Sequence, residues 1–179
     1  MAFTPHAIVA RNGQTLRVRY LTPDDGDLLI DLVLRLSEES RYQRFHVSID
    51  DMPMAELIRR LPPYLDVDGI NSLALLAMTD AEDGEHIVGV ARFRRQPDQP
   101  EAEAAVVVRD DWHRQGIGTA LMRQLAQAAL SVGIQRFIAM TQADNRAVHT
   151  MIRNMGIEYD SHFDSGEDYI VMYLEEKTP

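Results

Sequence analysis

The sequence contains no cysteine among its 179 residues. A disulfide framework, a thiolate metal site and a cysteine nucleophile are therefore excluded, whereas the redox compartment stays open. Basic residues are scarce, because 18 Lys and Arg stand against 28 Asp and Glu, giving a formal net charge of −10. A surface this acidic repels nucleic-acid phosphates and anionic membranes, so neither is expected as a partner. It suits a cationic partner such as an amine.

Long apolar runs are also missing. No window approaches the roughly 18 apolar residues that a membrane span needs, and the N-terminus lacks the basic and apolar segments of a secretion signal. We therefore predict a cytoplasmic protein, with an N-terminal arm over residues 1–13 and one domain over residues 14–179. The oligomeric state is left open, a homodimer included. The six histidines have no ligand spacing, so no metal is expected.

Alternating and helical periodicities predict a mixture of strands and helices. Strands are expected over residues 15–21, 72–79, 86–94, 101–108, 134–141, 157–163 and 168–174. Helices are expected over residues 23–36 and 37–45, from Asp50 or Asp51 to the Pro62-Pro63 pair, from about Gly118 to Gly133, and from Asn145 to Gly156. This order predicts an α/β fold in which a mixed central sheet carries helices on both faces.

A glycine-bearing segment after the strand 101–108 carries the clearest functional signal. Gly116 and Gly118 stand where a helix begins, and the first turn of a helix has unpaired N–H groups and a positive dipole end. Glycine lets a ligand approach those amides, so the segment suits phosphate, although a steric need for glycine at the turn explains the same pattern. Neither a P-loop nor a dinucleotide fingerprint is present, because no Gly-Lys-Ser/Thr follows and Leu121 or Met122 occupies the third glycine position.

Two stretches resemble a known family. Residues 112–122, WHRQGIGTALM, resemble the acetyl-CoA motif of the GNAT N-acetyltransferase superfamily, Gln/Arg-x-x-Gly-x-Gly/Ala, with His113 at its first position. Residues 36–45, LSEESRYQRF, resemble part of the Pat-type bacterial protein lysine acetyltransferases, which act on acyl-CoA synthetases. The resemblance spans about residues 15–174. It implies a GNAT-like, mostly antiparallel sheet and an enzyme that transfers acetyl from acetyl-CoA directly to an amine, namely a protein lysine.

The same resemblance implies the cofactor-binding residues. The pyrophosphate would lie on the turn formed by Arg114, Gln115, Gly116, Ile117, Gly118 and Thr119, with Arg114 adding a charge. Main-chain groups of Val106, Val107 and Val108 would pair with the pantetheine arm and polarise the acetyl carbonyl, and the same valines also fit a core strand. Asn145 would contact CoA or cap the helix that it begins.

Removal of a proton from the acceptor amine requires a general base. Glu103 is the candidate, because Ala102, Ala104 and Ala105 are small apolar neighbours that would desolvate it, and the family often places its base at this point of the strand. The alternative is a solvent-facing strand residue. Ile152 stands where many family members have a tyrosine general acid, a residue that Pat-type members also lack.

Two other functions remain open at this point. One is the same chemistry on a small amine or amino acid, and the other is a non-catalytic acyl-CoA sensor. If the acidic surface attracts the acceptor, acceptor affinity should fall with salt more steeply than CoA affinity.

Overall fold

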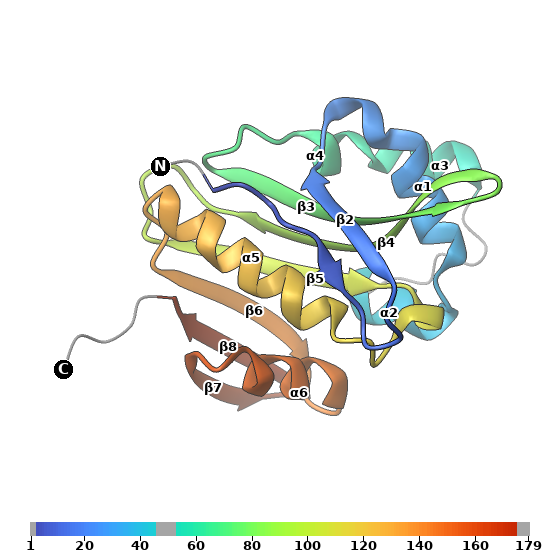
Figure 1. Cartoon of the computed structure of the whole chain (residues 1–179). Coiled ribbons are helices and arrows are strands. Elements are labelled where there is room, and N and C mark those ends of the chain that lie inside the picture. The colour runs from blue at the N-terminus through green and yellow to red at the C-terminus, as the bar shows by residue number, and fades with distance from the viewer. Residues whose placement is uncertain (1–2, 46–52, 175–179) are drawn as a thin grey trace.

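The computed structural model describes residues 3–45 and 53–174. A central sheet runs through the molecule in the order β1-β2-β3-β4-β5-β6-β8-β7 (Figure 1). Its strands are β1 (Ile8–Val9), β2 (Thr15–Tyr20), β3 (Ser72–Ala81), β4 (Gly84–Arg94), β5 (Glu101–Val108), β6 (Arg136–Gln142), β7 (Glu158–Asp164) and β8 (Glu167–Tyr173). Every neighbouring pair is antiparallel except β5 and β6, which are parallel. The expected mixed, mostly antiparallel sheet is confirmed.

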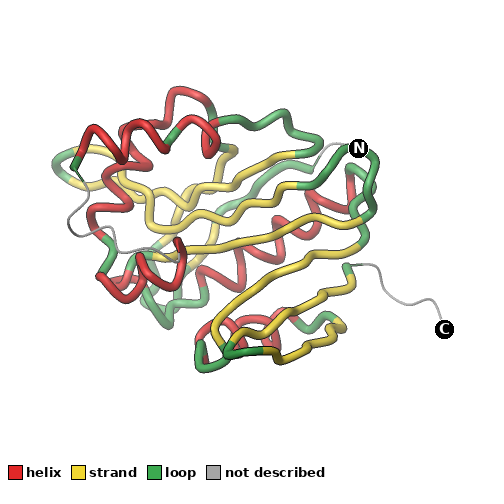
Figure 2. Tube along the Cα trace, turned by 180° about the vertical axis from the view of Figure 1, so that it is seen from behind, coloured by secondary structure: helices red, strands yellow, loops and turns green. Residues whose placement is uncertain are grey.

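Helices cover both faces of this sheet (Figures 1 and 2). They are α1 (Gly26–Arg35), α2 (Glu38–Phe45), α3 (Met54–Arg60), α4 (Pro62–Leu65), α5 (Ile117–Ser131) and α6 (Arg146–Met155), with 3-10 turns at Pro23–Asp25 and Asp110–Trp112. Leu121 and Leu125 of α5 are buried in one core, which α6 also joins, and Leu29 and Leu32 of α1 are buried in the core on the opposite face. No helix in the described part of the chain has the length and apolarity to cross a membrane.

One helix boundary differs from expectation. Pro62 and Pro63 were expected only to stop a helix, yet they also form the first turn of α4 directly after α3. Proline at the first helical positions loses no hydrogen bond, since those N–H groups are unpaired in any helix. The expected start of α3 at Asp50 or Asp51 lies outside the described residues.

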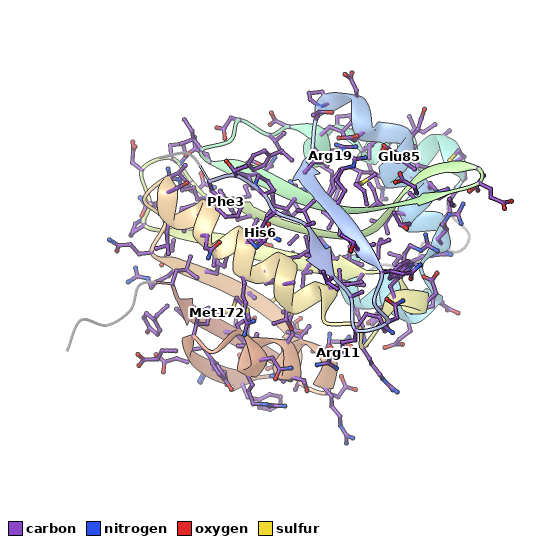
Figure 3. The ribbon with its side chains drawn as sticks, in the orientation of Figure 1. Phe3, His6, Arg11, Arg19, Glu85 and Met172 are labelled. Atoms are coloured by element: carbon purple, nitrogen blue, oxygen red, sulfur yellow. The ribbon has the colours of Figure 1, made fainter. Side chains whose placement is uncertain are left out.

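The N-terminal segment, expected as an arm, contributes to the sheet. Ile8 pairs with Leu16 of β2, and both Ile8 and Ala10 are buried. The backbone of His6 also exchanges hydrogen bonds of 2.9 and 2.8 Å with the side chain of Gln124 on α5, and Figure 3 shows Phe3 and His6 beside that helix. A two-residue strand is too short to produce an alternation, which is why the sequence pattern does not predict it.

His86 on β4 is held between two carboxylates. Its Nδ1 lies 2.9 Å from Asp31 Oδ2 of α1, and its Nε2 lies 2.8 Å from Asp83 Oδ1. The hydrogen bonds to Asp83 and Asp31 raise the pKa of His86, because only the protonated ring donates from both nitrogens. A histidine with a raised pKa contributes to the free energy of unfolding. That contribution is complete below the unfolded-state pKa of about 6.5, and it is lost as pH rises through the pKa of the folded state.

The free energy of unfolding should therefore decline as pH rises from about 6.5 through the raised pKa of His86. We expect the melting temperature to fall by about 2–4 °C over this range, the shift that about 1 kcal/mol causes in a domain of this size. His86→Gln should remove this part of the slope, and calorimetry of both proteins at several pH values measures it. An unchanged slope in the variant would contradict the assignment.

Candidate active site

Strands β5 and β6 separate along their length. Their parallel pairing runs from Glu101↔Arg136 to Glu103↔Ile138, and no further register pair joins these two described strands. Beyond this point β5 continues to Val108 against β4, while β6 continues against β8. A cavity of about 770 Å³ opens between them, and its lining includes the ends of both strands and the first turns of α5 and α6. The sheet thus presents unpaired strand edges to a ligand.

The start of α5 supplies a cradle of backbone amides. Arg114 and Gly116 adopt positive φ angles of 62° and 82°, the second being the N-cap of α5, which has no side-chain cap. No hydrogen bond between described residues uses the N–H groups of Ile117, Gly118 or Thr119. These groups line the cavity, at the positive end of the helix dipole. The turn therefore fits an anion such as phosphate.

Gly118 keeps the approach to these amides open. A Cβ built on it would meet Met151 Sδ at 3.5 Å and Val108 Cγ2 at 3.6 Å, which are ordinary contacts. The fold therefore has room for a methyl group here. The absent side chain leaves that space inside the cavity, where it is open to a ligand that approaches the amides.

Positive charge lines the cavity of this acidic protein. Its described lining contains Arg11, Arg44, Arg114 and Arg146 and one carboxylate, Glu103, although the whole chain carries a net charge of −10. A local excess of guanidinium groups attracts a polyanion against the field of the rest of the surface. The cavity thus combines cations with the amide cradle.

Sequence reasoning missed Arg11. The residue follows β1, its N–H donates to Gln115 O at 3.1 Å, and its Nη1 donates to Arg114 O at 3.3 Å. The neighbouring Asn12 N–H donates to Gln115 Oε1 at 3.0 Å. These bonds attach the N-terminal hairpin to the glycine turn. Because the partners are about a hundred positions apart, no local pattern signals them.

The three valines of β5 line the cavity, as their expected role requires. Val106, Val107 and Val108 are each half-buried, and backbone groups of β5 that do not pair with β4 point toward the gap. His113, which departs from the family pattern, places its Nε2 2.8 Å from Val108 O. This ring therefore ties the loop before α5 to the end of β5.

Glu103 lies where β5 and β6 separate and lines the cavity. Its expected desolvation is wrong, because the side chain is exposed. Successive strand residues point to opposite faces, so Ala102 and Ala104 pack in the core under α5 and leave Glu103 uncovered. The Glu103 side chain makes no hydrogen bond or ion pair with another described residue. The Glu103 carboxylate is therefore open to a ligand that enters the cavity.

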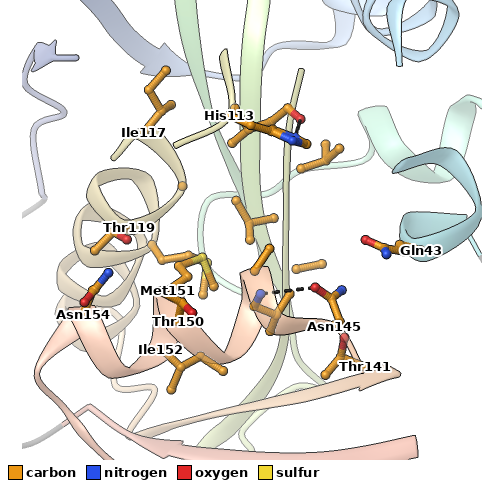
Figure 4. Close-up of a pocket in the computed structure, with 18 of the residues that line it drawn as sticks. Gln43, His113, Ile117, Thr119, Thr141, Asn145, Thr150, Met151, Ile152 and Asn154 are labelled. Carbon is orange, nitrogen blue, oxygen red and sulfur yellow. Dashed lines mark hydrogen bonds between the residues drawn. The ribbon is translucent and has the colours of Figure 1, made fainter. Parts of the chain in front are cut away.

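Asn145 caps α6, as one of its two expected roles requires. Its Oδ1 accepts a hydrogen bond of 3.2 Å from Val148 N (Figure 4). The residue is buried and lines the cavity, as does Thr141 at the end of β6. Gln43 of α2 lies opposite Asn145 in Figure 4. The cap accounts for one atom of the side chain, so both roles remain compatible.

The position that often carries a tyrosine acid is apolar. Ile152 is 1% exposed and belongs to the core. Three other side chains that could donate a proton in place of a tyrosine lie outside the cavity lining: His149 is 3.7 Å from Asp168, Tyr169 donates to Glu167, and Tyr173 donates to Asp160.

The stretch that resembles Pat-type enzymes fastens α2 to the loop before α5. Ser37 N and Ser37 Oγ donate to the carboxylate of Asp110 at 2.9 and 2.6 Å, and Ser40 Oγ donates at 2.8 Å. Burial raises the pKa of Asp110, but the bonds from Ser37 and Ser40 outweigh it and lower that pKa. Because Gln43 and Arg44 line the cavity from this helix, Asp110 positions one wall.

The resemblance to Pat-type enzymes implies that this wall contacts the acceptor, so Asp110→Ala should weaken acceptor binding. Without its three hydrogen bonds, α2 loses its attachment, and we expect the KM for the acceptor to rise about tenfold. The Kd of acetyl-CoA should change less than about threefold, since its cradle does not involve these bonds. Asp111→Ala, which removes an exposed partner of Arg109, is the matched control. A larger effect on acetyl-CoA than on the acceptor would contradict the prediction.

Comparisons with known proteins agree with this geometry. Residues 33–157 match the model of the acetyltransferase (GNAT) family. The acetyltransferase Pat of Mycolicibacterium smegmatis is 31% identical over 155 residues, covering 86% of this chain but only 44% of that relative. An acetyltransferase of Pseudomonas aeruginosa is 29% identical over 146 residues, covering 81% of this chain and 76% of that protein. The solved GNAT domain of S. lividans PAT matches with a TM-score of 0.78 at 25% identity, covering 93% of this chain and 94% of that one.

The separated strands and the backbone amides at the start of α5 form a site with the geometry to accept a phosphorylated ligand. The matches identify the family: the chain belongs to the acetyltransferase (GNAT) family and is an N-acetyltransferase, similar within that family to the Pat-type proteins. The family takes its acetyl group from acetyl-CoA.

Proposed function

We propose that this protein transfers the acetyl group of acetyl-CoA, bound between β5 and β6, to the side-chain amine of a protein lysine. The observation that carries the proposal is the cavity itself, where amides of Ile117, Gly118 and Thr119 and a local excess of arginine serve a polyanion. The lysine is supported by the similarity to Pat and by the Ser37–Asp110 attachment of α2, which gives the Pat-like stretch a role in the site.

Different groups of residues bind different parts of acetyl-CoA. The α5 amides hold the pyrophosphate, with Arg114 and Arg11 adding charge. Backbone groups of residues 106–108 hold the pantetheine arm, and one N–H there polarises the acetyl carbonyl. Asn145 adds a polar contact next to the α6 cap.

Transfer itself requires that the lysine nitrogen lose two protons, one before it attacks and one afterwards. Glu103 takes a proton from the lysine ammonium, directly or through water, and so frees the nitrogen lone pair. The nitrogen then bonds to the acetyl carbon, the carbon–sulfur bond breaks, and the electron pair leaves on the CoA sulfur. The nitrogen gives up its second proton to that thiolate, directly or through water, so the products are the neutral amide and the CoA thiol. A thiolate needs no strong acid to leave, because a thiol is far more acidic than an amine, which is consistent with Ile152 in place of a tyrosine.

The test is to incubate the protein with radiolabelled acetyl-CoA and a purified acyl-CoA synthetase. A parallel reaction replaces the synthetase with a panel of small amines and amino acids. We expect label on a lysine of the synthetase, located by mass spectrometry, together with stoichiometric release of CoA. Transfer only to small amines would replace the protein acceptor by a small one. Saturable acetyl-CoA binding without any transfer would indicate a sensor and would refute the proposed activity.

A further inference from the structure

The acceptor side of the sheet carries a group of arginines that the transfer chemistry does not use. On the β4–β5 pair, Arg92 lies opposite Ala105 and Arg94 lies opposite Glu103, and opposed residues of an antiparallel pair project from the same face. Arg44 of α2 lines the cavity with Glu103. We call Arg44, Arg92 and Arg94 the arginine cluster. It stands on the face that carries the candidate base.

The cluster is held in place by its surroundings. The guanidinium of Arg92 lies over the ring of Tyr64, 4.9 Å from its centroid, and Arg94 Nη2 donates to Pro63 O at 2.9 Å. Both partners come from α4. Stacked and hydrogen-bonded guanidinium groups lose little further freedom when they bind a ligand, so the cluster is preorganised.

The charges of Arg44 and Arg94 disfavour the charged form of Arg92. Burial and, to a smaller extent, the charges of Arg44 and Arg94 together lower the pKa of Arg92 to about 10, against smaller opposing effects of Tyr64 and Glu103. Burial likewise lowers the pKa of Arg44. An anion placed among like charges relieves their repulsion. This crowding is unexpected in a chain with a net charge of −10.

We propose that the acceptor carries a carboxylate close to its reactive amine, and that this carboxylate binds the arginine cluster while the amine lies at Glu103. The inference rests on the proposed acetyl transfer to a lysine amine and narrows the acceptors to those with a neighbouring carboxylate. A free lysine as the sole acceptor would support the carboxylate site but replace the protein acceptor proposed above. Guanidinium and carboxylate groups match in geometry and charge. The carboxylate is an acidic residue next to the acceptor lysine, or the α-carboxylate of a terminal or free lysine.

Matched acceptors isolate the carboxylate. One pair is a blocked peptide with Lys-Asp against the same peptide with Lys-Asn, and the other is free lysine against lysinamide. With the wild-type protein, we expect kcat/KM to favour the acid over its amide by about tenfold or more in at least one pair. The pair that responds identifies the source of the carboxylate.

Variants connect the preference to the cluster. Arg44→Gln and Arg92→Gln should each bring the acid-to-amide ratio close to one, whereas Arg17→Gln, an exposed arginine on β2 paired with Glu85, should preserve it. Arg92→Lys keeps the charge without the planar fork and should retain part of the ratio. Melting curves show which variants are folded. If Arg92→Gln does not fold, Arg92→Lys replaces it in the comparison of acid and amide.

The outcomes for the two proposals are distinguishable. Equal kcat/KM for acid and amide in both pairs, with transfer proceeding, would refute the carboxylate site and leave the proposed function standing. An absence of transfer to any lysine acceptor would refute the proposed function. In that case the Kd values of fluorescently labelled Lys-Asp and Lys-Asn peptides test the carboxylate site. Tighter binding of the Lys-Asp peptide supports the site, and equal Kd values overturn it.

Discussion

Glu103→Gln is expected to lower kcat by about 100- to 1,000-fold, the range that a positioned general base contributes. The amide has nearly the same shape as the carboxylate, but it cannot accept a proton from the acceptor ammonium. Because Glu103 is exposed and makes no bond to another described residue, the substitution should leave the melting temperature unchanged. The Kd of acetyl-CoA should also stay within about twofold.

A pH profile separates a base from a mere contact. The wild-type kcat/KM should rise with pH along a limb that the variant lacks. Glu101→Gln is the matched control, because Glu101 lies two residues earlier on the same face of β5 and outside the cavity lining. Full turnover of Glu103→Gln at every pH would show that this carboxylate is not the base.

Gly118→Ala is expected to weaken acetyl-CoA binding by about 10- to 100-fold, the loss of one or two charge-assisted hydrogen bonds. The new methyl group makes only ordinary contacts with Met151 and Val108, so the protein should fold. It would, however, occupy the space through which a phosphate reaches the amides of Ile117 and Thr119. Isothermal titration with acetyl-CoA measures the change.

The control is a glycine whose role lies in the backbone alone. Gly133 has φ 80°, and a Cβ there would have no neighbour within 4 Å. Gly133→Ala should therefore cost about 1 kcal/mol of stability through left-handed strain and leave the Kd unchanged. If Gly118→Ala bound acetyl-CoA as tightly as the wild type, the cradle would not be the pyrophosphate site.

Local pattern was sufficient for most strands and helices and for the glycine turn. The alternation of β2 and the apolar stripe of α5 each lie within one continuous stretch of sequence, so each can be read locally. The positive φ of Gly116 is a conformation that glycine adopts readily. Asn145 at the start of α6 was likewise predictable, because a short amide side chain favours that cap.

The rest of the site depends on contacts between distant segments. Asp110 binds Ser37 across 73 positions, and Arg11 reaches the turn at Gln115 across about a hundred. Glu103 shows a different reason for failure. Its neighbours in the sequence, Ala102 and Ala104, do not surround its side chain, because adjacent side chains of a strand project from opposite faces. The relevant neighbours are Arg94 across the sheet and Arg44 from α2.

The early separation of β5 from β6 has a consequence for the lifetime of the protein. Because the two halves of the sheet share backbone pairing only near Glu101–Glu103, the segment from β6 to β8 is held to the rest of the sheet mainly by core side chains such as Phe137 and Met172. Local opening of this segment would expose that core. A ligand between the strands binds the closed form alone and raises the cost of opening in proportion to the logarithm of its concentration. Proteases cut such open forms, so the abundance of this enzyme should follow the supply of its own acetyl donor.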